Sequence, residues 1–143
     1  EIMPSLVGSE MCIRDSISEN IHINGIIDRY LEHSRIFIFA NGGEEKYYIG
    51  SADWMPRNLD NRIEVLAPVY DKEIQADLKR IVCYGYRDTA KGRIVDGTGE
   101  NRPWENRPST LCKDFTPALA EAETATVVFR SQEELYRKYK NTL

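Results

Sequence analysis

The most distinctive segment of the chain is LEHSRIFIFANGGEEKYYIGSADWMPRNLDNRIEV, residues 31–65. Within it, RIFIF (35–39) is a short apolar run rich in aromatic and β-branched residues, which predicts a strand buried on both faces. The NGG stretch at 41–43 supplies residues that tolerate positive φ, and KYYIG (46–50) returns after it. The segment therefore predicts a β-hairpin.

Alternating apolar residues predict further strands outside this segment. These are expected at 21–27, 63–69 (ended by Pro68 or by the turn around Asp71), 91–95 and 124–129. Residues 98–117 are rich in Gly, Pro, Asn and Arg and have few periodic apolar positions. They are expected to form an extended surface loop.

A helical period replaces the strand pattern after Asp71, which is the expected N-cap. The apolar residues that share one helical face are Ile74, Leu78, Ile81 and Val82. Gly85 is the expected end of this helix. A capping box, Ser131-x-x-Glu134, predicts a short final helix. Strands combined with these helices indicate an α/β fold built in layers.

Length and charge limit the class of protein. The 143 residues suit a single domain, and no apolar run approaches the roughly 20 residues that a membrane span needs. The net charge of −4 argues against a nucleic-acid-binding protein. It does not argue against a local pocket for an anion, because net charge describes the far field only.

The cysteines are few, widely spaced and odd in number: Cys12, Cys83 and Cys112. The sequence has no CxxC pair, and neither histidine has metal-ligand spacing from a cysteine. Structural zinc and disulfides are therefore not expected, and the cysteines are interpreted as free thiols in a reducing cytosol.

The first residues do not match the rest of the chain. Residues 1–16, EIMPSLVGSEMCIRDS, lack strand or helical periodicity and are not a signal peptide. They resemble a recurrent non-native leader in translated sequencing data. The domain itself is expected to span 17–143.

Residues with phosphate chemistry gather in the hairpin region. His33 and Arg35 are two positions apart, so they share one face of an extended chain and could meet the same phosphate group. Imidazole can donate or accept a proton near neutral pH, which suits phosphoryl transfer. On the next strand, Ser51 could donate to a phosphate oxygen, and Asp53 could orient a histidine or hold a metal.

A third group follows in WMPRNLDNRIEV, around a turn expected at Pro56. Arg57, Asn58 and Arg62 are candidate ligands for a polyanion or a nucleoside triphosphate. The alternative is a solvated polar loop without function.

The order of these motifs resembles a degenerate phospholipase-D-type signature: His33-x-Arg35, Asn41, then Gly50-Ser51-x-Asp53. A fuller pattern resembles the C-terminal domain of polyphosphate kinase, namely YLEHSRI, NGG, SADWMPRN and RIEV. The resemblance covers roughly 17–143 and is densest from 30 to 66. It implies a phospholipase-D-like layered mixed β-sheet with flanking helices.

The resemblance implies an enzyme that reversibly moves the terminal phosphoryl group of ATP onto polyphosphate, with Mg²⁺, through a phosphohistidine in a preceding domain. His33 would be the catalytic residue of this domain, in nucleotide binding and acid–base assistance. The expected ATP and phosphate ligands are His33, Arg35, Ser51, Asp53, Arg57, Asn58 and Arg62, and no metal ligand is identified. The implied partners are ATP or ADP, inorganic polyphosphate, the preceding domains and further copies of the full-length protein, without nucleic acid.

We expect the chain to be a fragment that is inactive alone. The full-length enzyme is expected to be cytoplasmic and could associate with membranes. Two alternatives stay open. One is a phospholipase-D-like phosphodiesterase acting as a dimer, which Arg35 argues against because the usual signature has lysine there. The other is a polyphosphate-binding module without catalysis.

Overall fold

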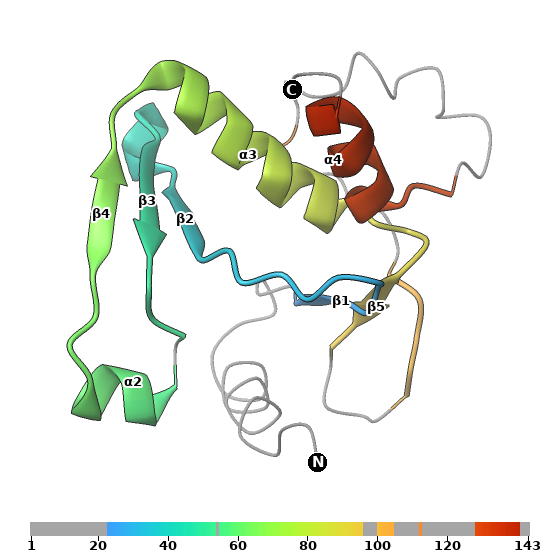
Figure 1. Ribbon diagram of the computed structural model, residues 1–143, viewed down its shortest axis with the longest axis horizontal. Helices are drawn as coiled ribbons and strands as arrows, with labels where there is room; N and C mark the ends of the chain where they lie inside the picture. Colours follow the sequence, from blue (N-terminus) through green and yellow to red (C-terminus); the bar gives the residue numbers. More distant parts are fainter. Residues whose placement is uncertain (1–22, 54, 96–99, 105–111, 113–127, 141–143) are drawn as a thin grey trace. The chain divides into compact units, whose positions relative to one another are not determined.

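The computed structural model describes residues 23–53, 55–95, 100–104, 112 and 128–140, and these form two compact units (Figure 1). The first unit contains 32–78, and the second contains 23–31, 79–95 and the described residues from 100 onward. In these ranges no helix has the length and apolar character needed to cross a membrane. The α/β class expected from the sequence is confirmed.

The first unit is built on an antiparallel sheet with the order β2-β3-β4. Its strands are β2 (Ile36–Phe39), β3 (Lys46–Gly50) and β4 (Leu66–Val69). Tyr47 of β3 lies opposite Ile38 and Val69, so these three side chains share one face of the sheet. Tyr47 is buried, which makes this face the core side of the unit.

The predicted hairpin is confirmed. Its connection contains a 3-10 turn, η1 (Asn41–Gly43), in which all three residues have positive φ, at 44°, 69° and 106°. The side-chain amide of Asn41 donates to the Glu44 carbonyl at 3.1 Å and closes the turn. The NGG stretch thus supplies the residues that this backbone needs.

Two details of the sheet differ from the expectation. The strand at 35–39 is not buried on both faces, because within the described residues β2 pairs only with β3 and Phe39 is 49% exposed. The strand predicted at 63–69 begins at Leu66 and continues through Pro68. Proline is tolerated there because β4 is an edge strand in the described part of the sheet.

Gly50 shapes the end of β3 that leads into the candidate site. A Cβ at this position would lie 2.9 Å from the Phe37 ring and 3.2 Å from a Leu66 methyl group. The missing side chain therefore lets both apolar groups close over the strand immediately before Ser51.

A short helix, α2 (Pro56–Asn61), replaces the turn expected at Pro56. Proline occupies the first helical position, where its fixed φ is favourable and no N–H is needed. Met55 and Asn58 are buried at 4% and 2% exposure, and they fasten the helix to the unit.

Helix α3 (Lys72–Tyr86) begins as predicted. The Asp71 carboxylate accepts hydrogen bonds from the N–H groups of Glu73 and Ile74 at 2.9 and 3.0 Å, which is N-cap geometry. The prediction that Gly85 ends the helix is wrong, since it is still helical. A Cβ there would lie 3.3 Å from the Ile26 side chain, so glycine at this position permits close packing.

The second unit contains a two-stranded antiparallel sheet of β1 (Asn24–Ile26) and β5 (Gly92–Ile94), within the ranges expected from the sequence. The final helix is also confirmed as α4 (Ser131–Lys140). Its first residue does not act through a capping box. The Ser131 hydroxyl donates instead to the buried Asp88 carboxylate at 2.7 Å.

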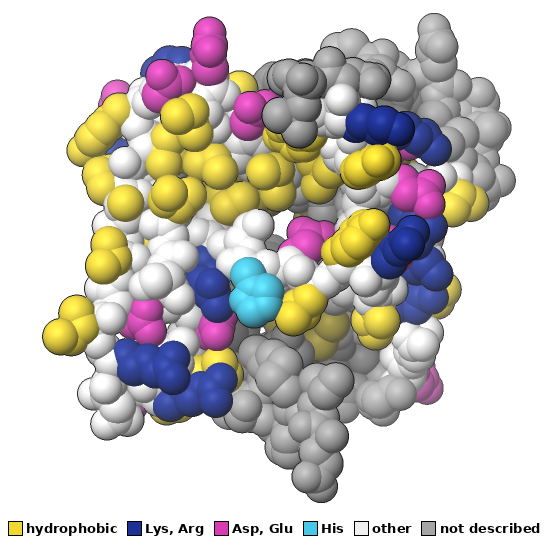
Figure 2. Space-filling view, viewed as in Figure 1, with side chains coloured by type: hydrophobic (Ala, Val, Ile, Leu, Met, Phe, Trp, Pro, Cys, Tyr) yellow, Lys and Arg dark blue, Asp and Glu magenta, His cyan; other side chains and the backbone are white. Residues whose placement is uncertain are grey.

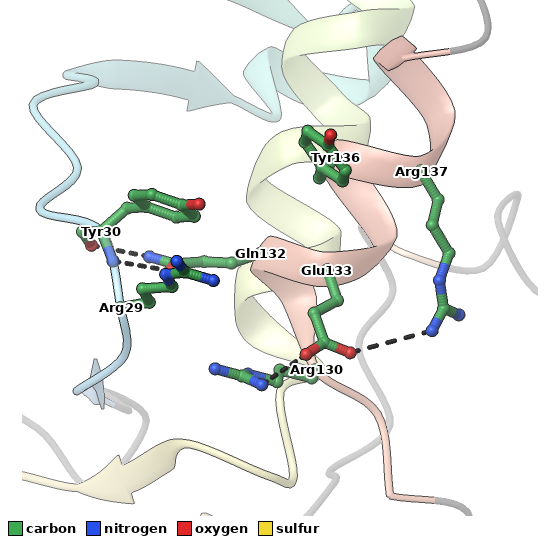
Figure 3. A pocket seen from close by; sticks show the side chains of 7 residues that line it. All are labelled: Arg29, Tyr30, Arg130, Gln132, Glu133, Tyr136 and Arg137. Atoms are coloured by element: carbon green, nitrogen blue, oxygen red, sulfur yellow. Dashed lines mark hydrogen bonds and ion pairs between the residues drawn. The ribbon is translucent and has the colours of Figure 1, made fainter.

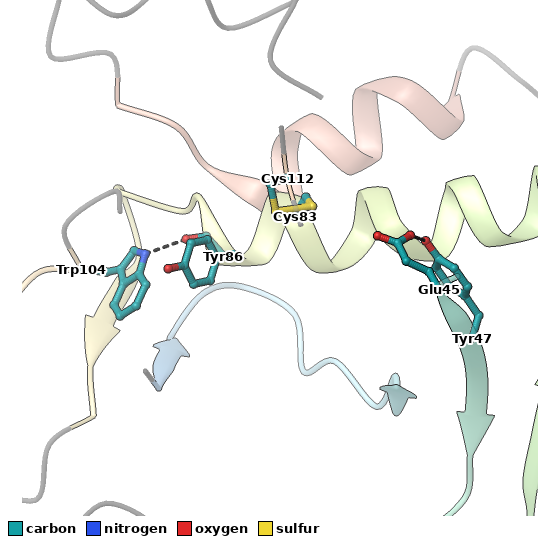
Figure 4. The surroundings of a disulfide bond; sticks show 6 residues. All are labelled: Glu45, Tyr47, Cys83, Tyr86, Trp104 and Cys112. Carbon is teal, nitrogen blue, oxygen red and sulfur yellow. Dashed lines mark hydrogen bonds between the residues drawn. A yellow bond between two sulfur atoms is a disulfide. The ribbon is translucent and has the colours of Figure 1, made fainter. Parts of the chain in front are cut away.

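The expectation that all cysteines are free thiols is wrong. Cys83 of α3 and Cys112 form a disulfide with a Cα–Cα distance of 5.5 Å (Figure 4). Both residues are fully buried. Spacing in the sequence could not reveal this bond, because it depends on where the fold brings residue 112. Cys12 lies outside the described residues.

The surface loop expected at 98–117 is only partly within the described residues: 100–103 are exposed and lie outside helices and strands, as expected, whereas Trp104 and Cys112 are buried. Trp104 is 4% exposed, and its Nε1 donates to the Tyr86 carbonyl at 2.6 Å (Figure 4). The Trp104 and Tyr86 rings pack edge to face, with their centroids 5.2 Å apart. Of the strand expected at 124–129, residues 124–127 lie outside the described part, and residues 128–130 are in no regular element.

Candidate functional site

His33 lies in the irregular segment that leads into β2, and its side chain is exposed. His33 is the only histidine within the described residues. Figure 2 shows its side chain (cyan) open to solvent. An imidazole in this position can reach a ligand without displacing any core residue.

Arg35 joins the two predicted motifs. Its Nε donates to Oδ1 of Asp53 at 2.8 Å, and its Nη1 donates to the His33 carbonyl at 3.0 Å. The Gly50 N–H donates to the Arg35 carbonyl at 2.9 Å, so backbone and side chain hold the same two segments together. The His-x-Arg and Gly-Ser-x-Asp motifs are therefore neighbours in space.

The Arg35–Asp53 pair is half exposed, with 26% and 39% of the side chains accessible. The hydrogen bond from Arg35 holds the pKa of Asp53 below its usual range, with smaller contributions from the charges of Arg57 and His33. The same bond raises the pKa of Arg35. Arg57 and His33 thus act on the same carboxylate as Arg35, and these residues form one electrostatic cluster.

Ser51 is part of a backbone junction. Its hydroxyl donates to the Glu64 carboxylate and accepts the Val65 N–H at 3.0 Å. Its own N–H donates to the Val65 carbonyl at 3.0 Å. The residue that the sequence assigned to a phosphate thus already ties the end of β3 to the segment before β4.

Glu64 was not singled out in the sequence. It binds the Ser51 hydroxyl, and its charge contributes to the raised pKa of Arg35. The RIEV string contains it, but only the pairing of the segments at 50–51 and 65–66 shows that it faces the cluster.

The remaining predicted ligands lie in α2 or directly after it, and they differ in how far they are exposed to solvent. Arg57 near its start and Arg62 after its end are exposed. Asn58 is 2% exposed, and its Oδ1 has no hydrogen-bond partner in the described part of the chain. The structure therefore brings Arg57 to the cluster around Asp53, leaves Arg62 on the open surface and buries Asn58.

In the described ranges, no group of three or more His, Cys, Asp or Glu side chains could hold a metal ion. Asp53, the candidate metal ligand from the sequence, is bound to Arg35. A guanidinium in contact with a carboxylate competes with a cation for its oxygens. In the part of the chain that the structure describes, the side chains around Asp53 therefore do not fit a protein-held metal site.

The chemistry of the cluster favours an anion. His33, Arg35 and Arg57 offer N–H donors on an accessible surface, whereas Asp53 is occupied by Arg35. Arginine and imidazole are suitable donors for phosphate oxygens. The arrangement can bind a phosphate group and can offer it a proton at His33.

Comparison with known proteins identifies the family of the chain. A profile described as "Polyphosphate kinase C-terminal domain 2" matches residues 6–113. A polyphosphate kinase of Escherichia coli (strain K12) is 47% identical over 115 residues, covering 76% of this chain and 17% of that protein. A polyphosphate kinase of Thermosynechococcus vestitus is 41% identical over 119 residues, covering 80% of this chain and 15% of that protein.

A solved structure gives the same result. The crystal structure of polyphosphate kinase from Porphyromonas gingivalis superposes with a TM-score of 0.70 at 34% sequence identity, over 90% of this chain and 18% of that one. The chain thus spans less than a fifth of the length of these relatives. It belongs to the polyphosphate kinase C-terminal domain family.

Proposed function

We propose that this chain supplies one half of a composite site that transfers the terminal phosphoryl group of ATP reversibly to polyphosphate. The relatives that it matches are named polyphosphate kinase. The observation that carries the proposal is the exposed cluster of His33, Arg35 and Arg57 around Asp53. The nucleophile, a histidine that becomes phosphorylated, would belong to a preceding domain.

His33 acts as the acid of the reaction. In-line transfer requires a nucleophile on one side of the phosphorus and a stabilised leaving group on the other. As the histidine of the preceding domain attacks, His33 protonates or hydrogen-bonds the leaving oxygen of ADP. In the reverse direction the same imidazole accepts that proton.

The arginines offset the negative charge that the phosphates bring together. Asp53 accepts the Nε–H of Arg35 and the His33 carbonyl accepts one N–H of Nη1, so the donors that Arg35 can turn toward phosphate oxygens are the second N–H of Nη1 and both N–H groups of Nη2. Arg57, whose charge also acts on Asp53, would bind the same phosphate group, and the exposed Arg62 would bind a phosphate farther along the chain. Asp53 is then a positioning residue for Arg35 rather than a phosphate ligand.

Magnesium enters with the nucleotide in this proposal. Mg²⁺ is commonly bound through substrate phosphates and keeps several of its waters, so it needs few protein ligands. This agrees with the occupied state of Asp53.

In the full-length protein, the preceding domains would complete the site, within a homo-oligomer. This chain alone then binds phosphate chains weakly and does not convert ATP to polyphosphate. The reason is that the proposal places the nucleophilic histidine in a preceding domain.

Calorimetry with ATP and with inorganic tripolyphosphate, at low and moderate salt, tests the proposal. Salt-sensitive binding is expected, and it should be lost in Arg57→Ala/Arg62→Ala but kept in the control Arg102→Ala/Arg137→Ala, which removes the same charge from other exposed positions. Equal binding by both variants would place the phosphates elsewhere. Tight binding by every variant would favour a polyphosphate-binding module without catalysis.

A further inference from the structure

The second unit contains a pocket between residues 29–30 and the first two turns of α4 (Figure 3). Its volume is about 560 Å³, which lies within the range of about 300–1,000 Å³ that is usual for sites of small ligands. Three arginines, two tyrosines, Gln132 and Glu133 line it. All of these residues belong to the second unit, and none belongs to the cluster around Asp53.

Two sets of hydrogen bonds fix the walls of this pocket. Gln132 pairs with the backbone of Tyr30 through both ends of its amide: Oε1 accepts the Tyr30 N–H at 3.0 Å, and Nε2 donates to the Tyr30 carbonyl at 2.7 Å (Figure 3). At the start of α4, the buried Asp88 carboxylate accepts the N–H and the hydroxyl of Ser131 at 2.8 and 2.7 Å. A pocket whose walls are already fixed costs little to order when a ligand binds.

Arg130 is a firmly held cation in the lining. Its Nε donates to Oδ2 of Asp28 at 2.9 Å, and its Nη2 donates to Oδ1 at 2.6 Å. The Asp28 side chain is 1% exposed, and the hydrogen bonding from Arg130 holds its pKa below the usual range, so Asp28 is ionised at neutral pH. Asp28 therefore offsets the charge of Arg130, while Nη1 of Arg130 stays available to an acceptor in the pocket.

The other two arginines differ in their partners. Arg137 donates from Nη1 to Glu134 at 2.6 Å, so Glu134 offsets its charge. Arg29 forms no ion pair in the part of the chain that the structure describes, and its guanidinium lies over the Tyr30 ring, 5.5 Å from the centroid. Once each of the two paired arginines is matched with its carboxylate, the charge of Arg29 remains.

A carboxylate of the chain itself already lies in this pocket. Glu133 accepts a hydrogen bond from Nη1 of Arg130, and its second oxygen lies 3.8 Å from Nη2 of Arg137 (Figure 3). Glu133 is thus held between two arginines, as an anionic ligand would be. Its side chain is 49% exposed, and ion pairs at such exposed positions contribute little, so the carboxylate can turn out to solvent at small cost.

We propose that this pocket binds the carboxylate of a ligand that also carries an aromatic or apolar group, and that Glu133 occupies the carboxylate position until the ligand displaces it. The incoming carboxylate takes over the donors of Arg130 and Arg137 and gains Arg29, the lining cation without an acidic partner among the described residues. The two exposed tyrosine rings of the lining receive the aromatic or apolar group.

The charge balance selects a monoanion over polyphosphate. When Glu133 turns outward, the three arginines and the two carboxylates that hold Arg130 and Arg137 carry one net positive charge, which a single carboxylate neutralises. A polyphosphate chain would bring several negative charges close to the same acidic side chains. The ligand of this pocket therefore differs from that of the phosphate site proposed in the first unit, and either proposal can fail without the other.

Titration of the full chain with phenylacetate, followed through the backbone amide resonances of residues 29–30 and 131–137, tests the proposal. Phenylacetamide has the same ring and shape without the charge, so it is the matched ligand control. The capped dipeptide acetyl-Glu-Phe-amide presents the same two groups from a peptide. A saturable shift centred on these residues is expected, and the tighter-binding carboxylate probe identifies a free acid or a peptide segment as the source of the carboxylate.

Two variants test the roles of the charged residues. Arg29→Ala should weaken binding about tenfold, because it removes a charged donor. Glu133→Gln should tighten binding about twofold to fivefold, because the competing carboxylate is gone. Arg102→Ala and Glu100→Gln are the matched controls: they remove the same charges from exposed positions of the same unit and should leave the affinity unchanged.

The absence of any amide shift with both carboxylate probes at millimolar concentration would overturn the proposal. Equal binding of phenylacetamide would do the same, since it would show that the arginines do not recognise the charge. An unchanged or weakened affinity in Glu133→Gln would overturn the displacement of Glu133 by the ligand.

Discussion

The Cys83–Cys112 disulfide makes a large and measurable contribution to stability. It closes a loop with a sequence separation of 29 residues, which by the chain-entropy relation stabilises the folded state by about 3.6 kcal/mol. Because both residues are fully buried, the bond also lies within a core that cannot relax around its loss. For a chain of 143 residues this corresponds to a fall in Tm of about 10 °C.

The assay compares oxidised and reduced wild type with Cys83→Ala/Cys112→Ala in urea denaturation followed by circular dichroism. Cys12→Ala is the control, because it removes a cysteine but leaves the bond intact. Thiol titration of the unfolded, non-reduced chain should find one thiol of the three cysteines. Three thiols before reduction would show that the bond does not form, and equal midpoints with and without reductant would show that it does not stabilise the fold.

Three further results are expected. Asp88→Ala leaves four hydrogen-bond donors in the second unit without their acceptor and should lower the free energy of unfolding by about 3 kcal/mol or more. Urea titration measures this change, and a value below about 1 kcal/mol would contradict the prediction. The arginine partners of Asp28 and Asp53 lower the pKa values of these carboxyl groups. The stability that the two groups contribute is therefore complete above about pH 4 and is lost as pH falls through the folded pKa values. Acid unfolding that shifts to lower pH in Asp53→Asn would contradict this. Gly50→Ala places a methyl group 2.9 Å from the Phe37 ring and should cost about 1–3 kcal/mol in thermal or urea unfolding, and no loss would show that the ring moves freely.

The hairpin and α3 could be predicted because their determinants are local. The NGG turn lies between two apolar runs, and Asp71 precedes a clear helical period. Each signal comes from neighbouring residues and needs no knowledge of the rest of the fold.

The errors concern residues whose role depends on distant partners. Gly85 looks like a helix end, but its role is to admit Ile26 from a strand far away in sequence. Cys83 pairs with Cys112 across a separation that carries no signal. Ser131 has the spacing of a capping box, yet the buried Asp88 takes its hydroxyl instead.

The residues of the candidate site also differ in whether their roles depend on nearby or on distant parts of the sequence. His33 and Arg35 could be selected from their types and spacing, and their closeness to Asp53 agrees with the order of the motifs. That Asp53 is occupied by Arg35 could not be read from the sequence. Nor could the burial of Asn58, because α2 was not expected and a turn would not have given it an inner face.

The most direct test of the account is a titration of the chain with inorganic tripolyphosphate, observed through the imidazole resonances of His33. His22→Gln assigns the signal, since these are the two histidines of the chain. We expect a saturable shift of the His33 signal that weakens with salt and is strongly reduced in Arg57→Ala/Arg62→Ala. A His33 signal that stays unchanged at millimolar tripolyphosphate would contradict the claim that this residue stands at a phosphate site.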